Sequence, residues 1–300
     1  MSSTAITKTK NAIEIRGLRK HYSGFELGPL DLDVPRGSIF GFIGPNGAGK
    51  STTIDLMFGM GRCDAGSISM LGLHHQRDEV AVKERAAYVG PELDYSNWKK
   101  VKKAIRFLRG FYPDSWDDHY CAKLLDRFNL DPEDRVATLS FGSRTKLSLV
   151  LALARRPELL VLDEPTTGLD ALAKHELFAA LLELMEDKEN TILISSHNLS
   201  DLERFADHIG IINNGQLLHA GPMDKIVDPF CIVDFTLPVT EPFPSDVGVK
   251  LIHREGGRAR ALVDRGAGGI EKIECAGAQD LSQSTVTLEE LFVSLLKDDR

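Results

Sequence analysis

One stretch of nine residues constrains the fold of this chain more than any other feature. It follows a short apolar run, residues 38–43, and it precedes residues that fit a helix starting near Lys50. The pattern is G-x-x-x-x-G-K-[S/T], a loop whose backbone N–H groups bind phosphate when it joins a buried strand to a helix. That order of elements predicts an α/β fold with buried parallel strands. The stretch reads Gly44, Pro45, Asn46, Gly47, Ala48, Gly49, Lys50, Ser51 and Thr52.

This loop predicts a site for a nucleotide bound with Mg²⁺. Lys50 is expected to reach the β- and γ-phosphates, and the hydroxyl of Ser51 to ligate Mg²⁺. The alternative is a glycine-rich turn that only closes a strand–helix unit. The apolar run before the loop and the helix after it favour the nucleotide site, because the motif requires that context. The other expected contacts with the nucleotide are Gly44, Asn46, Gly47, Ala48, Gly49 and Thr52.

A pair of carboxylates supplies the second half of such a site. Asp163 and Glu164 follow the apolar residues 159–162, which fit a second buried strand. Asp163 is expected to hold Mg²⁺, directly or through water, and Glu164 to orient or deprotonate the attacking water. Taken alone, the pair would be an ordinary acidic cap at a strand end. Together with the Lys50 loop, it predicts nucleotide hydrolysis.

A third pattern lies just before the acidic pair. Residues 139–143 read Leu-Ser-Phe-Gly-Ser, and they resemble the signature motif of ABC (ATP-binding cassette) proteins, usually Leu-Ser-Gly-Gly-Gln. The resemblance covers residues 13–226 and includes four more motifs in the family's order. They are the aromatic residue that stacks on adenine, the Q-loop, the D-loop and the switch histidine, which correspond to Tyr22, Glu92, residues 167–170 ending in Asp170, and His197.

Each of these residues has an ordinary structural interpretation when it stands alone. Tyr22 would be a half-buried strand aromatic, Glu92 a loop carboxylate, and His197 a packed or surface histidine. His197, however, follows a third apolar strand, and the order of all the motifs favours the site roles. The resemblance then implies that Glu92 is a further Mg²⁺ ligand. It also implies that Lys50, Glu164 and His197 are the catalytic residues.

The resemblance implies a fold and a mechanism. The fold is a P-loop NTPase cassette, with a mixed and mainly parallel sheet, an antiparallel β subdomain and a helical subdomain. Each cassette is half of a catalytic site, so two of them, identical or different, close head-to-tail on ATP and Mg²⁺. Hydrolysis reopens the pair and so drives a rigid-body movement. The residues expected to serve the opposite cassette are Ser140, Phe141, Gly142 and Asp170.

Three positions depart from the family pattern. Glu92 replaces the usual glutamine, which keeps an oxygen for Mg²⁺ or water but loses an N–H donor and adds charge. Phe141 replaces a glycine and Ser143 replaces a glutamine, whereas Ser140 and Gly142 are retained. We therefore expect the contact with the opposite nucleotide to form, and the rate of hydrolysis stays open.

The chain is expected to act with a separate membrane protein. It has 300 residues, a net charge of −8, and no run approaching the roughly 18 apolar residues that span a bilayer. The acidic balance argues against nucleic acid as a partner. The resemblance therefore implies an ATP-binding subunit that is cytoplasmic, peripheral on the inner face of the cell membrane, and paired with a separate permease. Similarity to subunits of ABC-2 antibiotic and peptide exporters favours export over import.

Two other classes of function stay open at this point. One is a soluble regulatory or ribosome-associated ABC ATPase. The other is a nucleotide-dependent interaction module that hydrolyses weakly, which Phe141 and Glu92 suggest. A neighbouring gene for a membrane protein with about six apolar spans would favour transport over both. A transporter needs such spans, each of roughly 20 apolar residues, and this chain has no run of that kind.

Permease contact in the family falls between the Q-loop and the signature. Tyr95, Trp98 and a basic helix over residues 99–109 lie there. The ordinary interpretation of this helix is a solvated face above an apolar stripe. The alternative is that its lysines meet an acidic permease loop or anionic lipid headgroups.

The sequence also divides into two predicted domains. The cassette is expected over residues 12–227, with its helical subdomain at about 93–150. Four prolines between residues 229 and 244 mark a shift in composition. An accessory α+β domain is therefore expected over residues 228–300, ending in a helix with a capping box that starts at Thr287.

Overall fold

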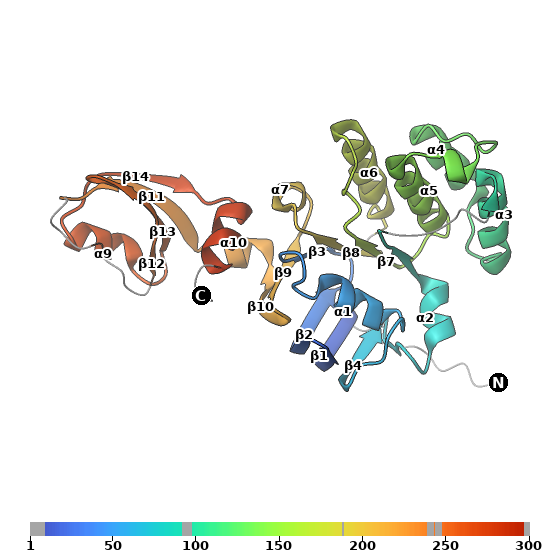
Figure 1. Cartoon of the computed structure of the whole chain (residues 1–300), viewed down its shortest axis with the longest axis horizontal. Helices are drawn as coiled ribbons and strands as arrows, with labels where there is room; N and C mark the ends of the chain where they lie inside the picture. The colour runs from blue at the N-terminus through green and yellow to red at the C-terminus, as the bar shows by residue number, and fades with distance from the viewer. Residues whose placement is uncertain (1–9, 92–97, 188, 239–242, 244–247, 297–300) are drawn as a thin grey trace. The chain divides into compact units, whose positions relative to one another are not determined.

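The computed structural model describes residues 10–91, 98–187, 189–238, 243 and 248–296 (Figure 1). Within these ranges, no helix has both the length and the apolar character that a membrane span requires. The chain forms two compact units, which we describe separately. The first comprises Met1–His197 and Phe205–Ala220, and the second comprises Asn198–Arg204 and Gly221–Arg300.

The core of the first unit is a six-stranded sheet made of β3 (Ile39–Ile43), β6 (Ala86–Val89), β7 (Leu159–Asp163), β8 (Thr191–Ser196), β9 (His208–Asn213) and β10 (Gln216–Pro222). The strand order is β10-β9-β3-β8-β7-β6, and the pairs from β9 to β6 are parallel. Every residue of β3, β7 and β8 is buried, which explains the apolar runs that they contain, residues 39–43, 159–162 and 192–194. Because these strands are parallel, their carboxyl ends meet at one edge of the sheet.

An antiparallel sheet forms the β subdomain, with strands β1 (Asn11–Tyr22), β2 (Phe25–Pro35), β4 (Ala65–Met70) and β5 (Leu73–His74). Its order is β2-β1-β4-β5. Leu30, Leu32 and Val34 of β2 are buried, and the residues between them are exposed, as expected of a strand with one face on the core. That face shares one apolar cluster with Phe40 and Phe42 of β3. The antiparallel subdomain thus rests against the central sheet.

Six α-helices complete the described part of the first unit: α1 (Lys50–Met57), α2 (Glu79–Arg85), α3 (Val101–Phe111), α4 (Asp118–Arg127), α5 (Phe141–Leu153) and α6 (Ala171–Leu184). Helices α5 and α6 both begin at a side-chain cap. The hydroxyl of Ser140 accepts the N–H of Ser143, and the carboxylate of Asp170 accepts the N–H of Ala173. The caps fix where the two helices begin, α5 inside the signature motif and α6 directly after the D-loop.

The second unit contains α7 (Leu199–Leu202), α8 (Met223–Val227), β11 (Phe230–Thr236), β12 (Val249–Glu255), β13 (Arg258–Asp264), α9 (Gly269–Cys275), β14 (Gln279–Thr285) and α10 (Leu288–Leu296). Its antiparallel sheet has the order β12-β13-β11-β14. Alternate residues of β11 pack on Ile273 of α9 and on Leu291 of α10, so both faces of the sheet carry a helix. The capping box is present, because Thr287 and Glu290 exchange hydrogen bonds. The fold class expected from the sequence is confirmed.

Candidate active site

The phosphate loop joins the carboxyl end of β3 to the N-terminus of α1. Gly47 and Gly49 have φ angles of 80° and 110°, which glycine adopts without steric cost. A Cβ atom on Gly44 would lie 2.3 Å from the carbonyl oxygen of Ile212, so no larger residue fits there. The loop ends on the first amides of α1, which have no partner inside the helix. Backbone donors arranged in this way bind an anion such as phosphate.

The ammonium group of Lys50 stands between this loop and the acidic edge of the sheet. The side chain is only 5% exposed, and its Nζ donates to the carbonyl oxygen of Gly44 at 2.8 Å. Nζ also lies 3.2 Å from Oε1 of Glu164. A cation at this position faces the phosphate oxygens of any nucleotide that the loop amides bind.

The remaining loop residues differ in their exposure. Asn46, Gly47 and Ser51 are exposed and Thr52 is half-buried, so a ligand can reach all four. Ala48 is 2% exposed, and its carbonyl oxygen accepts the N–H of Gly215 at 2.9 Å. Ala48 therefore anchors the loop to the turn between β9 and β10.

Asp163 supplies a buried negative charge beside the loop. It ends β7, is 2% exposed, and accepts a hydrogen bond from the hydroxyl of Ser195. Among the described residues, Asp163 forms no ion pair. Burial raises the pKa of nearby Asp55, and the charge of Asp163 raises it further. A divalent cation suits this environment, because the oxygens of Asp163 and Ser51 are of the kind that Mg²⁺ prefers.

Glu164 is held in an unusual backbone conformation and contacts two other predicted catalytic residues. Its φ angle is 51°, a left-handed value that costs roughly 1–3 kcal/mol in a residue other than glycine. Its side chain is 16% exposed, with Oε1 next to Lys50 and Oε2 2.6 Å from Nδ1 of His197. The ring of His197, just beyond β8, is half exposed. A carboxylate held between a cation and an imidazole is well placed to accept a proton from water.

Tyr22 presents an exposed aromatic ring at the end of β1. The residue is 43% exposed, and Nζ of Lys20 lies 5.4 Å from the centre of its ring. Tyr22 pairs with Phe25 of β2, whose ring would touch a Cβ atom on Gly49 at 3.1 Å. Tyr22 is therefore next to a residue that packs on the phosphate loop. Its exposed ring can stack on a planar group.

The signature residues lie together with the D-loop at the N-termini of α5 and α6. The ring of Phe141 lies against Gly168, and Gly142 lies next to Leu169. Ser140, Phe141 and Asp170 are exposed. Within the described residues, none of these side chains bonds to the phosphate loop of its own chain. The cluster is thus open to a second molecule.

Two residues named from the sequence, Glu92 and Tyr95, lie outside the described residues. Two others that contact the site were not singled out in the sequence. Ser195 bonds to both members of the acidic pair, and Phe25 packs beside the phosphate loop. The signal for Ser195 was weak, because it precedes His197 by two residues in an otherwise ordinary strand. Phe25 follows a turn and carries no signal at all.

Comparisons with known proteins agree with this geometry. The family model described as "ABC transporter" matches residues 27–167. The daunorubicin/doxorubicin resistance ATP-binding protein DrrA of Streptomyces peucetius is 33% identical, over 73% of this chain and 68% of the relative. The Nod factor export ATP-binding protein I of Burkholderia lata is 31% identical, over 72% of each.

A solved structure, described as the ATP-binding subunit of an ABC transporter, superposes on this fold with a TM-score of 0.65. It is 31% identical in sequence, and the match covers 72% of this chain and 91% of that one. The chain belongs to the ATP-binding proteins of ABC transporters, which are ATPases.

Proposed function

We propose that this chain powers export through a separately encoded permease, by closing on a second cassette around Mg–ATP and reopening after hydrolysis. The observation that carries the proposal is the position of Glu164 between Lys50 and His197. That arrangement brings a carboxylate into contact with an ammonium group and an imidazole, which supports the roles of base, phosphate-binding cation and orienting group. Hydrolysis needs these three roles at the γ-phosphate.

In the proposed reaction, the oxygen of a water molecule attacks the γ-phosphorus while the bond to the bridging oxygen of ADP breaks. Glu164 takes the proton that the water loses, and His197 holds the carboxylate in place through its 2.6 Å contact. Lys50 and the loop amides offset the charge that develops on the phosphate oxygens. The products are ADP and inorganic phosphate.

Ser51 and Asp163 are the two residues of this chain that we propose would hold Mg²⁺ through their side-chain oxygens. The ion would neutralise charge on the β- and γ-phosphates. The support is the exposed hydroxyl of Ser51 and the buried carboxylate of Asp163, which lacks an ion-pair partner among the described residues. Glu92 stays proposed as a further ligand and lies outside those residues.

The second cassette is proposed to present the signature to this phosphate loop. The support is the cluster of Ser140, Phe141 and Asp170, which are exposed, with half-buried Gly142; among the described residues it makes no bond with the loop of its own chain. The free amides at the start of α5 would add partial positive charge at the γ-phosphate. Reopening after hydrolysis would then transmit movement to the permease.

The permease is proposed to dock on α3. With this docking, the proposed location of the subunit is the cytoplasm, at the inner face of the membrane. Trp98, Phe107 and Phe111 form a row of aromatic rings, and Phe107 and Phe111 are exposed. Lys103 and Arg106 have no ion-pair partner among the described residues. An exposed face of this kind suits an acidic or aromatic partner.

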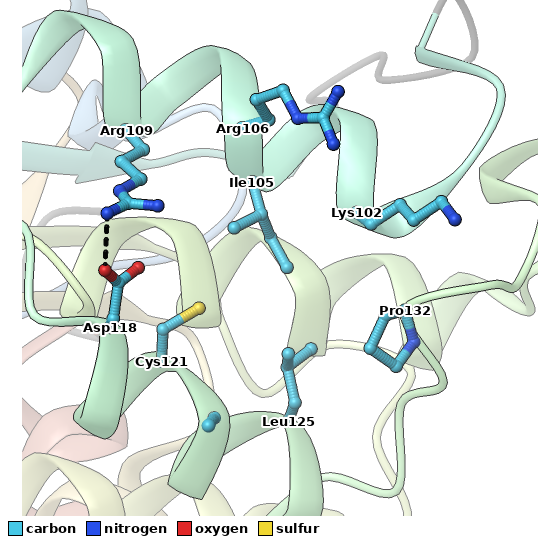
Figure 2. Close-up of a pocket in the computed structure, with 9 residues that line it drawn as sticks. Lys102, Ile105, Arg106, Arg109, Asp118, Cys121, Leu125 and Pro132 are labelled. Carbon is cyan, nitrogen blue, oxygen red and sulfur yellow. Dashed lines mark ion pairs between the residues drawn. The ribbon is translucent and has the colours of Figure 1, made fainter.

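A shallow groove of about 300 Å³ lies between α3 and α4. Figure 2 shows Ile105 and Leu125 facing each other across it, with Arg109 bonded to Asp118 at one end. Lys102, which lines the groove, and Lys100, which precedes α3, both bond to Glu133. Hydrogen bonds from Lys100 and Lys102 lower the pKa of Glu133 to about 2. The solvated-face interpretation therefore fits these two lysines, and the docking interpretation fits Lys103 and Arg106.

The direction of transport is proposed from the relatives, one of which is named for export of Nod factor and another for drug resistance. The test is ATP hydrolysis by the full chain purified with its membrane partner. We expect Glu164→Gln to lower kcat at least about 100-fold while ATP still binds and holds two cassettes together. Unchanged kcat in Glu164→Gln, or a wild-type complex without ATPase activity, would refute the proposal.

A further inference from the structure

Ser195 is a buried residue whose hydroxyl contacts both members of the acidic pair. It is 0% exposed and lies opposite Asp163 in the parallel pairing of β7 and β8. Its Oγ donates to Oδ1 of Asp163 and accepts the backbone N–H of Glu164 at 3.0 Å. A hydroxyl has one donor and two acceptor sites, so both bonds form at once.

These two bonds restrict the two carboxylates in different ways. The bond to Oδ1 limits rotation of the Asp163 side chain and leaves Oδ2 available to a ligand. The backbone N–H of Glu164 donates to the hydroxyl of Ser195 and also to its backbone oxygen, at 3.3 Å. These bonds support the left-handed φ angle of 51° at Glu164. In that conformation the Glu164 side chain reaches Lys50 and His197.

We propose that Ser195 is a positioning residue, whose hydroxyl sets the orientation of Asp163 toward Mg²⁺ and of Glu164 toward the attacking water. The inference rests on the roles proposed above for these two carboxylates. Ser195 itself touches no reacting atom. Its effect passes through its two hydrogen bonds, as is common for residues that orient the ligands of a metal.

The chain offers a matched control four residues earlier in the same strand. Thr191 is also 0% exposed, and its hydroxyl accepts the backbone N–H of Gly37 at 3.0 Å. Its side chain points to the same face of the sheet, about 13 Å from Ser195 along the strand. Ser195→Ala and Thr191→Val each delete one buried hydroxyl that accepts an N–H. Only the first deletion touches the acidic pair.

The experiment measures kcat at saturating Mg–ATP and the affinity for ATP with Mg²⁺ and with EDTA, on the full chain with its membrane partner. Ser195→Ala should lower kcat about 10- to 100-fold. It should also reduce, about 10-fold, the ratio of the ATP affinity with Mg²⁺ to the ATP affinity in EDTA, which we call the Mg²⁺ gain. Its affinity in EDTA should not change. Thr191→Val should lower the melting temperature to a similar extent and leave kcat and the Mg²⁺ gain within about 2-fold of wild type, since mutations at well-separated sites act independently.

Equal effects of the two variants on kcat and on the Mg²⁺ gain would overturn the inference. Ser195→Cys, with a similar volume and a weaker donor and acceptor, is the second variant if Ser195→Ala does not fold. Its kcat should fall measurably below wild type, and full kcat with the full Mg²⁺ gain would contradict the inference. A wild-type chain that does not hydrolyse ATP would instead refute the proposed function, so the two failures are distinguishable.

Discussion

The ring of Phe141 lies against the backbone of Gly168, so that a Cβ atom on Gly168 would be only 2.8 Å from Cδ1 of the ring. Phe141 is the first residue of α5, and Gly168 lies in the turn before α6. The contact exists because phenylalanine occupies a position where the family usually has glycine. It couples the signature to the D-loop within a single chain.

This contact predicts how Gly168→Ala depends on residue 141. Gly168 has a φ angle of 72°, so alanine there costs about 1–2 kcal/mol from the left-handed backbone alone. The new Cβ atom forces the exposed ring of Phe141 to shift, which should add about 0.5–1.5 kcal/mol. In a Phe141→Ala background only the backbone cost should remain. Urea unfolding of the wild type, the two single variants and the double variant measures the energetic coupling between residues 141 and 168. Strictly additive costs would show that the ring does not restrict residue 168.

A second prediction concerns His197, whose ring contacts Oε2 of Glu164 at 2.6 Å. His197→Ala should lower kcat about 100-fold, because the carboxylate loses the group that orients it. ATP binding should persist, since the loop and Lys50 are untouched. Single-turnover hydrolysis and nucleotide binding separate the two effects. His219→Ala, an exposed histidine of β10, is the control and should resemble wild type. Loss of binding in His197→Ala would contradict this role.

Much of this site could be predicted from the sequence because of where its residues lie. Strands β3, β7 and β8 are covered on both faces, so each contains a continuous apolar run, residues 39–43, 159–162 and 192–194, that stands out from its surroundings. Lys50, Asp163 and His197 each follow one of these runs closely. Since parallel strands end at one edge, residues far apart in the sequence meet there.

Other features could not be predicted, for physical reasons. The role of Ser195 depends on the register that places it opposite Asp163, and no spacing along the chain reveals that register. In the second unit, β14 is an edge strand whose residues are exposed except for half-buried Leu281. It therefore lacks the alternation by which strands are found. The final helix was predictable, because the capping box at Thr287 and Glu290 is a local signal.

A third prediction concerns the thiol of Cys121, which is 4% exposed on α4. Burial raises its pKa from an ordinary 9.0 to about 11. Below pH 9 the thiol is protonated in the folded and unfolded chain alike. Between pH 9 and 11 the unfolded chain loses the proton first, so this group lowers stability as the pH rises. Wild type should therefore lose more stability between pH 8 and 10 than Cys121→Ala does.

Alkylation gives a direct check on the same thiol. At pH 8 the exposed Cys275 should react readily, and Cys121 should react only after unfolding. Mass spectrometry of the labelled peptides reports both rates in one sample. Equal rates for Cys121 and Cys275 in the folded chain would contradict the burial and the raised pKa.

A fourth prediction concerns recruitment through α3. Replacing Lys103 and Arg106 with glutamine should weaken co-purification with the membrane partner, because these side chains have no ion-pair partner among the described residues. The control is the same change at Arg77 and Lys83, which removes two charges from a different part of the first unit. ATP binding should be unchanged in both. Equal co-purification of the two double variants would rule out these two side chains as the docking contact.

The last prediction tests whether the second unit folds separately from the site. Leu291 of α10 is 0% exposed and packs on Ile232 and Leu262. Leu291→Ala should cost the second unit about 2–5 kcal/mol of unfolding free energy. Every residue proposed for ATP and Mg²⁺ lies in the first unit. ATP affinity should therefore stay within about 2-fold of wild type, as expected when sites are independent.

Thermal unfolding followed with and without ATP measures this separation. The melting temperature of the second unit should fall in Leu291→Ala, and the stabilisation of the first unit by ATP should persist, because a ligand stabilises only the unit that binds it. Val293→Ala, an exposed change on the same helix, is the control and should leave both units near wild type. If Leu291→Ala removed ATP binding as well, the two units would fold as one. The accessory domain proposed over residues 228–300 would then be part of the cassette.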